Sequence, residues 1–380
     1  MRITVLAGGV GGARFTLGLR EALAADARDA PSHPLSHPHP HPHPHPHPHV
    51  RKDVAIGSDA AALRADSDIS AAADRANAAE RASDAPAEHD ITVVANVGDD
   101  MWLAGVKVCP DLDSLMYALA GVNDDERGWG RAGESERVAG ELTAYGVGWP
   151  WFTLGDLDLG THLARTSLLR DGATLTEATA QLSARWQLGA TLLPVTNDEV
   201  PTHVVTDEGI LHFEEWWVRT RAQAPASRFV QHGLERARIS HAAQAAIHDA
   251  DVLLIAPSNP VVSIGTILGI PGVRDALRTA SAPVVGVSPI IGGRALRGMA
   301  ATCLGVIGVE ADAAAVAEHY GARSRGGLLD GWLVAEEDAG GLGRLRDLDI
   351  RAEARPLLLT PGGPAAQVAR DALALATALA

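Results

Sequence analysis

Residues 2–15 decide the fold of this chain, and they read Arg2-Ile-Thr-Val-Leu-Ala-Gly-Gly-Val-Gly-Gly-Ala-Arg-Phe15. Residues 3–7 are apolar and rich in β-branched side chains, which predicts a buried strand. Four of the next five residues are glycine, and apolar residues at helical spacing then predict a helix that opens at Ala13. After such a loop, unpaired N–H groups and the helix dipole point at the same place, which favours an anion. We therefore expect a phosphate site formed by Gly8, Gly9, Gly11 and Gly12, with Arg14 as a charge partner.

The glycine loop departs from two familiar nucleotide-binding motifs. A dinucleotide fingerprint counted from Gly9 requires glycine at position 14, where this chain has arginine. A Walker loop requires a Gly-Lys-Ser/Thr sequence, which does not follow. The alternative is a glycine-rich turn that only packs the helix on the strand. So many glycines at a first strand-to-helix turn favour phosphate over that alternative.

The overall composition limits the classes of partner. The chain has 380 residues and a formal net charge of −15, from 32 basic and 47 acidic residues, which argues against a nucleic-acid partner. No apolar run approaches the roughly 20 residues of a membrane span, and the start is too glycine-rich for a signal peptide. Cys109 and Cys303 form no disulfide or metal-ligand pattern, so we expect a cytoplasmic protein without a membrane partner.

Residues 26–89 differ in composition from everything around them. Histidine alternates strictly with proline from His37 to His49, and an Ala/Asp-rich stretch nearly free of large apolar residues follows. Proline at every second position forbids helices and sheet ladders, so we expect a low-complexity, disordered insertion. The alternating histidines offer ligands for transition metals, but an expansion with no chemical role is the simpler interpretation.

The remaining residues, 1–25 and 90–380, predict one α/β domain. Short buried strands alternate with amphipathic helices, the pattern of a Rossmann-like, mostly parallel sheet with helices on both faces. Residues around 125–235 break this alternation and include an expected hairpin across 207–209, so we expect a smaller appended α+β region there. The apolar run at 357–359 predicts the last strand.

Carboxylates follow the second predicted strand, residues 91–95, at the edge where open α/β sheets bind ligands. Asp99 and Asp100 lie directly after it, and Asp111 and Asp113 lie in the first turn of the next predicted helix. Interaction with the helix dipole is a sufficient explanation for Asp113, but not for a pair directly after a strand. Carboxylates that converge beside a phosphate site commonly hold Mg²⁺, which prefers oxygen ligands.

A second polar loop follows the strand predicted at 251–256. Ser258 and Asn259 lie at the carboxyl end of that strand, where a nucleotide would bind in a sheet of this kind. The alternative is that both residues only cap the next helix, a role for which serine and asparagine are well suited.

Several motifs in the same order resemble the 2-phospho-L-lactate transferase family of coenzyme F-420 biosynthesis. The resemblance covers the chain on both sides of the insertion to about residue 332, and residues 215–219 and 327–332 resemble the actinobacterial branch, the phosphoenolpyruvate transferases. The motifs that carry it are the glycine loop to Phe15, Asn96-Val-Gly-Asp-Asp100, Cys109-Pro-Asp-Leu-Asp113, Gly155-Asp-Leu-Asp-Leu-Gly-Thr-His162, Ala256-Pro-Ser-Asn-Pro-Val-Val-Ser-Ile-Gly265 and Val287-Ser-Pro-Ile-Ile-Gly-Gly293.

The resemblance implies a transferase that joins a three-carbon acid, carried by guanosine diphosphate, to the deazaflavin Fo (7,8-didemethyl-8-hydroxy-5-deazariboflavin) and releases GMP. The acid is phosphoenolpyruvate or 2-phospholactate, and the sequence leaves that choice open. By the same resemblance, Asp99 and Asp111 are catalytic residues that hold Mg²⁺, and Asp99 and Arg137 contact Fo. The glycine loop, Arg14, Ser258 and Asn259 bind the donor. A second copy of the chain, as in a homodimer, is left open as a partner.

Two other functions compete with this interpretation. A related family with a similar glycine loop and acidic motif binds UDP-sugars as a regulator without catalysis, but the motif from Cys109 to Asp113 and the region around Trp216 weigh against it. A nicotinamide-dependent dehydrogenase is the other alternative, and arginine in place of the third glycine weighs against it.

Overall fold

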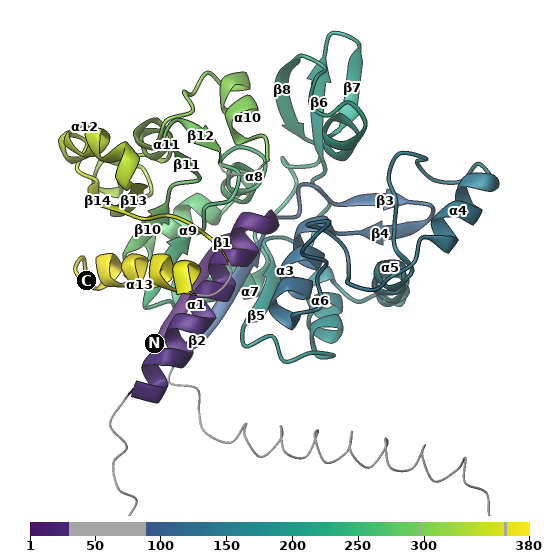
Figure 1. The fold of residues 1–380 in the computed structure, drawn as a ribbon, viewed down its shortest axis with the longest axis horizontal. Coiled ribbons are helices and arrows are strands. Elements are labelled where there is room, and N and C mark those ends of the chain that lie inside the picture. Colours follow the sequence, from purple (N-terminus) through teal and green to yellow (C-terminus); the bar gives the residue numbers. More distant parts are fainter. Residues whose placement is uncertain (30–88, 296–297, 361–362) are drawn as a thin grey trace, which may run out of the picture. The chain divides into compact units, whose positions relative to one another are not determined.

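The computed structural model describes residues 1–29, 89–295, 298–360 and 363–380 (Figure 1). The insertion predicted for residues 26–89 lies almost wholly outside the described residues. Within the described part of the chain, Met1–Asp26 and His89–Ala380 form one compact unit. No helix in this part is long and apolar enough to cross a membrane.

Seven parallel strands form the central sheet in the order β14-β13-β10-β9-β1-β2-β5. The strand order reverses between β1 and β9, which makes this pair the topological switch point of the sheet. Both strands are apolar and buried on both faces, as expected where helices cover both sides. The predicted Rossmann-like α/β class is confirmed. The strands are β1 (Arg2–Ala7), β2 (Asp90–Ala95), β5 (Thr191–Pro194), β9 (Val252–Ile255), β10 (Val284–Val287), β13 (Gly331–Ala335) and β14 (Arg351–Arg355).

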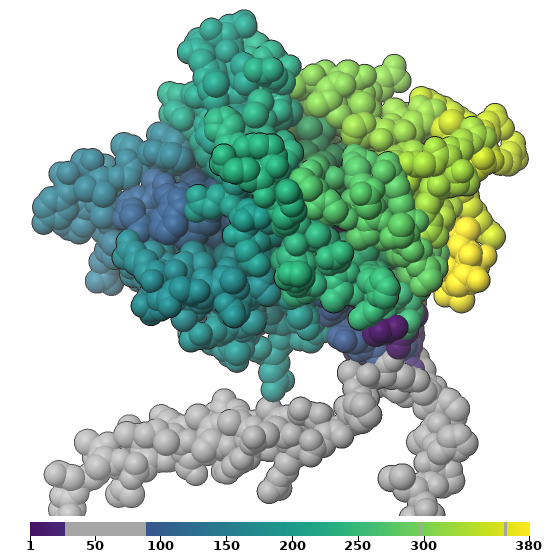
Figure 2. Space-filling model, turned by 180° about the vertical axis from the view of Figure 1, so that it is seen from behind, coloured from purple at the N-terminus to yellow at the C-terminus, as the bar shows by residue number. Residues whose placement is uncertain are grey.

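Helices cover both faces of this sheet (Figure 1). Thr4 of β1 donates a 2.7 Å hydrogen bond to the Ala246 carbonyl of α7, whereas a side chain at Gly12 of α1 would meet Cβ of Ala7 at 2.8 Å. Because successive strand residues point to opposite faces, α7 and α1 cover opposite faces of β1. Viewed from behind, teal and green segments make up most of the visible surface and little of the purple N-terminal segment is visible (Figure 2). The α-helices are α1 (Gly9–Asp29), α3 (Pro110–Ala120), α4 (Arg137–Ala144), α5 (Asp156–Arg170), α6 (Leu175–Ser183), α7 (His241–His248), α8 (Ile264–Gly269), α9 (Val273–Thr279), α10 (Ala300–Val306), α11 (Ala313–Tyr320), α12 (Leu342–Asp347) and α13 (Gly363–Thr377).

Two antiparallel pieces lie outside the central sheet, beside helices α4, α5 and α6, and the first of them precedes the predicted region 125–235 in the sequence. The first is a hairpin whose turn residues, Ala104 and Gly105, both have positive φ, as two-residue hairpin turns require. It packs Met101 and Leu103 against Leu154 in a small second core. The second is a three-stranded sheet in the order β7-β6-β8, which confirms the predicted hairpin across 207–209. The remaining elements are β3 (Met101–Leu103), β4 (Val106–Val108), β6 (Thr202–Thr206), β7 (Gly209–His212), β8 (Ala226–Gln231), β11 (Ile290–Ile291), β12 (Arg294–Ala295), the π-helix η1 (Glu215–Arg219) and the 3₁₀ turns η2 (Arg323–Arg325) and η3 (Glu336–Gly341).

Three local predictions were wrong. The first helix begins at Gly9 rather than Ala13, because Gly9 adopts a φ of +60° that turns the chain directly out of β1 into α1. Strand β5, inside the range expected to be separate α+β structure, instead pairs with β2 at the edge of the central sheet. The last strand is β14 and not the apolar run at 357–359.

Candidate active site at the carboxyl edge of the sheet

The acidic residues predicted to form the site lie after the end of β2 and in the first turn of α3. Asn96, directly after β2, donates a 2.7 Å hydrogen bond from Nδ2 to Oδ2 of Asp111 and a 3.2 Å bond to the Val262 carbonyl. Its Oδ1 accepts a bond from the Gly98 amide at 3.0 Å. Asn96 is completely buried, so these bonds fix Asp111 against the loop that follows β9.

The glycine loop and the β9 loop are joined across the switch point. Ser258 donates from Oγ to the Gly8 carbonyl at 2.7 Å and accepts from the Gly8 amide at 3.0 Å. A side chain at Gly8 would lie 2.5 Å from Oδ2 of Asp111, so only glycine lets the acid approach the loop so closely. The loop, Ser258 and Asp111 therefore form one structure at the edge where open α/β sheets bind ligands.

Each of the other loop glycines has a structural reason to be glycine. Gly9 has positive φ, and added Cβ atoms at Gly11 and Gly12 would meet the Pro257 carbonyl oxygen at 2.5 Å and Cβ of Ala7 at 2.8 Å. Residues 9–12 form the first turn of α1, where N–H groups lack partners within the helix. Close packing and an anion site are compatible here, so phosphate binding by this loop stays a prediction.

The structure places the other predicted site residues on three different elements. Asn259 accepts hydrogen bonds from the amides of Val261 and Val262 at 3.0 and 3.3 Å and so shapes the loop after β9. Arg14 lines a pocket of about 230 Å³ between α1 and α3. Arg137 is exposed at the first position of α4. Their roles in binding donor or acceptor stay predictions.

Burial and mutual repulsion shape the electrostatics of the acids. Burial, followed by the charges of Asp111, Glu214 and Asp100, raises the pKa of Asp99 well above its usual value. Burial raises the pKa of Asp111 to about 6, although hydrogen bonds from Asn96 and the Gly9 backbone oppose the shift. Burial and then Asp111 raise the pKa of Glu214 to about 8. Asp99, Asp111 and Glu214, the acid cluster, therefore repel one another when ionised.

Asp99 and Asp100 are neighbours in sequence with different surroundings. Asp100 lies 3.7 Å from the buried Lys107 ammonium, and Cys109 donates to it from Sγ at 3.1 Å. Among the described residues, Oδ1 of both aspartates is buried without a hydrogen-bond partner, but only Asp100 has a cation beside it. A buried carboxylate oxygen without a partner beside two other acids calls for a cation. Oxygen donors of this kind suit Mg²⁺, so the residues present fit that ion.

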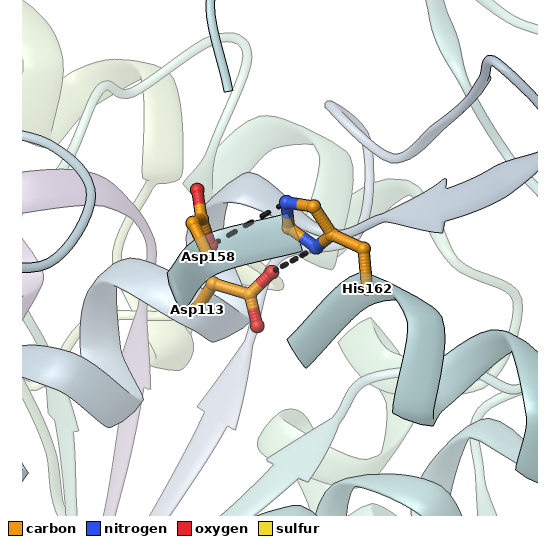
Figure 3. Close-up of side chains that lie close together, drawn as sticks. All are labelled: Asp113, Asp158 and His162. Atoms are coloured by element: carbon orange, nitrogen blue, oxygen red, sulfur yellow. Dashed lines mark ion pairs between the residues drawn. The ribbon is translucent and has the colours of Figure 1, made fainter. Parts of the chain in front are cut away.

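A second buried group, Asp113, Asp158 and His162, also brings possible metal ligands together, all within 4.8 Å of one another (Figure 3). His162 on α5 lies between the two acids, with Nδ1 3.5 Å from Asp113 and Nε2 3.4 Å from Asp158. Arg165 makes a two-pronged ion pair with Asp113, and its Nη1 is 3.3 Å from Nδ1 of His162. Arg165 already pairs with Asp113, and Tyr117 on α3 donates a 2.7 Å hydrogen bond to Asp158, so we assign this group to packing α5 against α3 rather than to a metal.

This ion pair corrects the explanation given for Asp113 from the sequence. Asp113 is 4% exposed and does more than complement the dipole of α3, because Arg165 also donates to the Lys107 carbonyl at 3.2 Å. Thr166, the next residue on α5, accepts from the Lys107 amide at 2.8 Å. Helix α5 therefore holds the first turn of α3 and strand β4 in place. These two elements flank Asp111 and lie beside Asp100, so α5 helps to position both acids.

Comparison with known proteins decides the family. Residues 75–347 match the family model described as 2-phospho-L-lactate transferase CofD. A curated protein of Mycobacterium avium (strain 104) named "Phosphoenolpyruvate transferase" is 46% identical over 383 residues, 99% of each chain. One of Mycobacterium tuberculosis (strain ATCC 25618 / H37Rv) with the same name is 44% identical over 387 residues, all of both chains.

The chain belongs to the 2-phospho-L-lactate transferase family.

Membership in this family makes the chain a transferase enzyme. It therefore weighs against both competing functions, the UDP-sugar-binding regulator and the nicotinamide-dependent dehydrogenase. Two solved structures of protein BH3568 from Bacillus halodurans, one described as a member of the upf0052 family, share the fold. They have TM-scores of 0.54 and 0.53 and cover 98% of this chain and 99% and 98% of their own. At 16% and 15% identity, they support the fold alone.

This transferase also carries site residues that the sequence analysis missed. Glu214 completes the acid cluster, although it precedes η1 far along the chain from Asp99. His212, two residues earlier, lies beside the Asp100 backbone, and burial lowers its pKa to about 4, so its ring is neutral at neutral pH. Trp216, in the region that weighed against the UDP-sugar-binding regulator, lies on η1 and is completely buried.

Proposed function

We propose that this enzyme transfers a phosphoenolpyruvyl group from a guanosine-diphosphate-activated donor to the terminal hydroxyl of Fo, releasing GMP and forming dehydro coenzyme F-420-0. The names of the mycobacterial relatives support phosphoenolpyruvate over 2-phospholactate as the acid, because those relatives match the full length of this chain. The activity then belongs to coenzyme F-420 biosynthesis.

One observation carries this proposal. The unpartnered Oδ1 of Asp99 lies in an acid cluster with Asp111, and Asp111 reaches the glycine loop at the switch point of the sheet. A site built this way combines a place for a divalent cation with the N-terminus of α1, where phosphates bind well. Transfer of a substituted phosphate between two oxygens depends on that combination of positioning and charge neutralisation.

In the proposed reaction, the terminal oxygen of Fo attacks the phosphorus that bears the acid, and the bond from that phosphorus to the GMP oxygen breaks. The hydroxyl proton passes to a carboxylate of the acid cluster, and GMP leaves with the electron pair. Mg²⁺, when bound, supplies Lewis-acid polarisation of the phosphate oxygens. Asp99 and Asp111 hold the cation, Asp99 and Arg137 contact Fo, and the first turn of α1 with Arg14, Ser258 and Asn259 binds the donor.

We also propose that residues 1–25 and 90–380 form the transferase domain and that residues 26–89 are an insertion without a part in the chemistry. Replacing 30–88 by a short Gly/Ser linker is expected to leave turnover and melting temperature nearly unchanged, because closing a longer loop costs little. A large loss of turnover would contradict the proposal.

The activity is tested by incubating the protein with Fo, Mg²⁺ and either guanylated phosphoenolpyruvate or guanylated 2-phospholactate, with product masses as the readout. We expect the mass of dehydro coenzyme F-420-0 and an equal amount of GMP from the first donor. Product from the second donor alone would reassign the acid. Absence of product from both, with Fo and guanine nucleotide bound, would contradict the proposed function.

A further inference from the structure

A lysine side chain is buried beside the acids of the candidate site. Lys107, on β4, is 5% exposed, and its Nζ lies 3.7 Å from Oδ2 of Asp100 and 3.5 Å from Oε1 of Glu199. Burial by itself lowers the pKa of Lys107, but Asp100 and the other acidic groups around it outweigh that effect and raise the pKa above its usual value. The side chain is therefore a permanent ammonium at neutral pH.

The surroundings of Lys107 fix this ammonium in place. Trp102, its directly opposed residue in the β3–β4 hairpin, lies with its ring centroid 5.9 Å from Nζ and donates a 2.6 Å hydrogen bond to the same oxygen of Glu199. The Lys107 backbone is bonded on both sides to α5, by Thr166 and Arg165. An ammonium held in this way stays next to its acidic partners, whereas a bound ion exchanges with solvent.

The buried acids of this region fall into two groups. Asp100 pairs with Lys107, and Asp113 pairs with Arg165. Among the described residues, no lysine or arginine pairs with a member of the acid cluster, and no cation is among the groups that shift the pKa values of its members. The charge of Asp100 nevertheless raises the pKa of Asp99, so Asp100 lies close to the cluster. The cluster therefore lacks a cation, while the neighbouring Asp100 already has one.

The adjacent carboxylates of Asp99 and Asp100 raise the question of how many metal ions the site holds. Many enzymes that transfer phosphate groups hold two divalent ions about 3.5–4 Å apart, which stabilise the attacking and the leaving oxygen. Here the Lys107 ammonium lies against Asp100, the acid that a second ion would need as a ligand. A positive charge at that position repels a second divalent ion and occupies its ligand.

We propose that Lys107 takes the place of a second divalent ion, so that the site holds one ion, on Asp99 and Asp111. This inference rests on the proposed function, which puts Mg²⁺ on those two acids. Lys107 is then a positioning residue, because it contacts Asp100 and keeps that acid from acting as a metal ligand. Without its charge, Asp100 becomes an additional ligand, so the ion binds more tightly but shifts away from Asp111, and transfer slows.

The first test counts ions on the wild-type protein without nucleotide. Electron paramagnetic resonance measures free Mn²⁺, an ion that prefers the same oxygen ligands as Mg²⁺, as it is added to wild type and to Asp99→Asn. The ions lost in Asp99→Asn are those held by the acids, and ions bound elsewhere on the chain cancel. We expect a difference of one ion per chain. A difference of two would overturn the inference.

The second test compares Mn²⁺ affinities in four variants. In Lys107→Met, which removes the charge but keeps an unbranched side chain, we expect tighter binding by about tenfold or more, because a positive charge next to a divalent ion is gone. Asp100→Asn leaves the ammonium without that partner and should weaken binding by a similar factor. The double variant removes both charges and should return close to wild type. Lys107→Arg keeps the charge and should also stay close to wild type.

Turnover separates this role from a purely structural one. At saturating metal, Lys107→Met should transfer more slowly than wild type by about tenfold or more, the usual range for groups that orient metal ligands, although its metal affinity is higher. A general packing defect would instead weaken metal binding and slow transfer together. Slower transfer with weaker Mn²⁺ binding in Lys107→Met would therefore overturn the inference.

Arg323→Met is the matched control, because Arg323 is also a partly buried cation and pairs with Asp330 at 2.7 Å, but it lies on η2. It should leave Mn²⁺ affinity unchanged. A folded Lys107→Met protein that binds Mn²⁺ no more tightly than wild type, or Asp100→Asn that binds it no more weakly, would overturn the inference and leave the proposed function intact. If Lys107→Met does not fold, the ion count and Asp100→Asn decide. Equal Mn²⁺ binding by wild type and Asp99→Asn would overturn the proposed metal site as well.

Discussion

Asn96 and Asp111 are joined by a buried 2.7 Å hydrogen bond that links the end of β2 to the first turn of α3. The bond leaves Asp111 oriented toward the glycine loop and close enough to Asp99 for its charge to raise the pKa of Asp99. Groups that orient a metal-binding carboxylate commonly change metal affinity or activity by 10- to 100-fold when removed.

We therefore expect Asn96→Ala to raise the Mg²⁺ concentration for half-maximal transfer by about tenfold or more. The readout is rate of product formation as a function of Mg²⁺. Gln367→Ala is the control, since Gln367 also donates an amide hydrogen bond to an aspartate, Asp371 at 2.9 Å, but on the surface of α13. A Mg²⁺ dependence in Asn96→Ala equal to that of wild type would show that Asp111 needs no such support.

The pair of Asp113 with Arg165 predicts a loss of stability rather than a small effect at a helix start. Both side chains are buried, and Asp113→Asn leaves the guanidinium without its counter-charge. Breaking a buried ion pair in this way costs about 3–5 kcal/mol of unfolding free energy. Chemical denaturation measures it. Arg165→Met should lower the unfolding free energy by a similar amount. The double variant should lower it by less than the sum of the two single variants, because neither charge is then left buried without its partner.

Gly11 is expected to be intolerant of even one methyl group. An added Cβ would lie 2.5 Å from the Pro257 carbonyl oxygen, which the β9 loop holds in place, so Gly11→Ala should destabilise the fold by roughly 1–3 kcal/mol. Gly343 lies in α12, and a Cβ there meets nothing within 4 Å. Gly343→Ala should instead stabilise by about 0.5–1 kcal/mol, since alanine favours helix. Equal effects at both positions in thermal denaturation would contradict the packing account of the loop.

The raised pKa values of the acid cluster predict how stability changes with pH without metal. The folded-state pKa is about 6 for Asp111 and about 8 for Glu214, above the ordinary values near 4. The folded state therefore binds more protons than the unfolded state in this range, and stability falls as pH rises from about 4 to about 8.

Mg²⁺ competes with those protons, so its effect should have the opposite pH dependence. We expect the rise in melting temperature on adding Mg²⁺ to be larger at pH 8 than at pH 5. Thermal denaturation at both pH values, with and without EDTA, measures it. An equal shift at the two pH values would mean that the metal does not bind these carboxylates.

The start of the fold could be predicted from sequence because its signals are local. An apolar run, a set of glycines and a helical periodicity follow one another within residues 2–23, and the strand and helix form there. The helix boundary could not be predicted, since glycine accepts helical and non-helical backbone alike and gives no signal of where α1 begins. Strand β14 was missed because it is a charged edge strand, Arg351–Arg355, without the apolar pattern of buried strands.

The acids after β2 could be predicted for the same reason, but their partners could not. Glu214 and His212 reach Asp99 and Asp100 only because the β6–β7 hairpin packs beside them. No periodicity or spacing in a single chain shows which distant segments meet. The pairing of Asp113 with Arg165 on α5 was missed for that reason, because Asp113 by itself had an ordinary local explanation at a helix start.

The central claim, that Asp99 and its acid cluster form a metal-dependent transfer site, is tested most directly by one rate measurement. Product formation from Fo and guanylated phosphoenolpyruvate is followed by mass as Mg²⁺ is raised, in wild type and in Asp99→Asn. We predict a rate in wild type that depends on Mg²⁺ and is lost with EDTA, and a rate in Asp99→Asn lower by about 100-fold or more at every Mg²⁺ concentration. A wild-type rate indifferent to Mg²⁺, or a folded Asp99→Asn protein as fast as wild type, would contradict the claim.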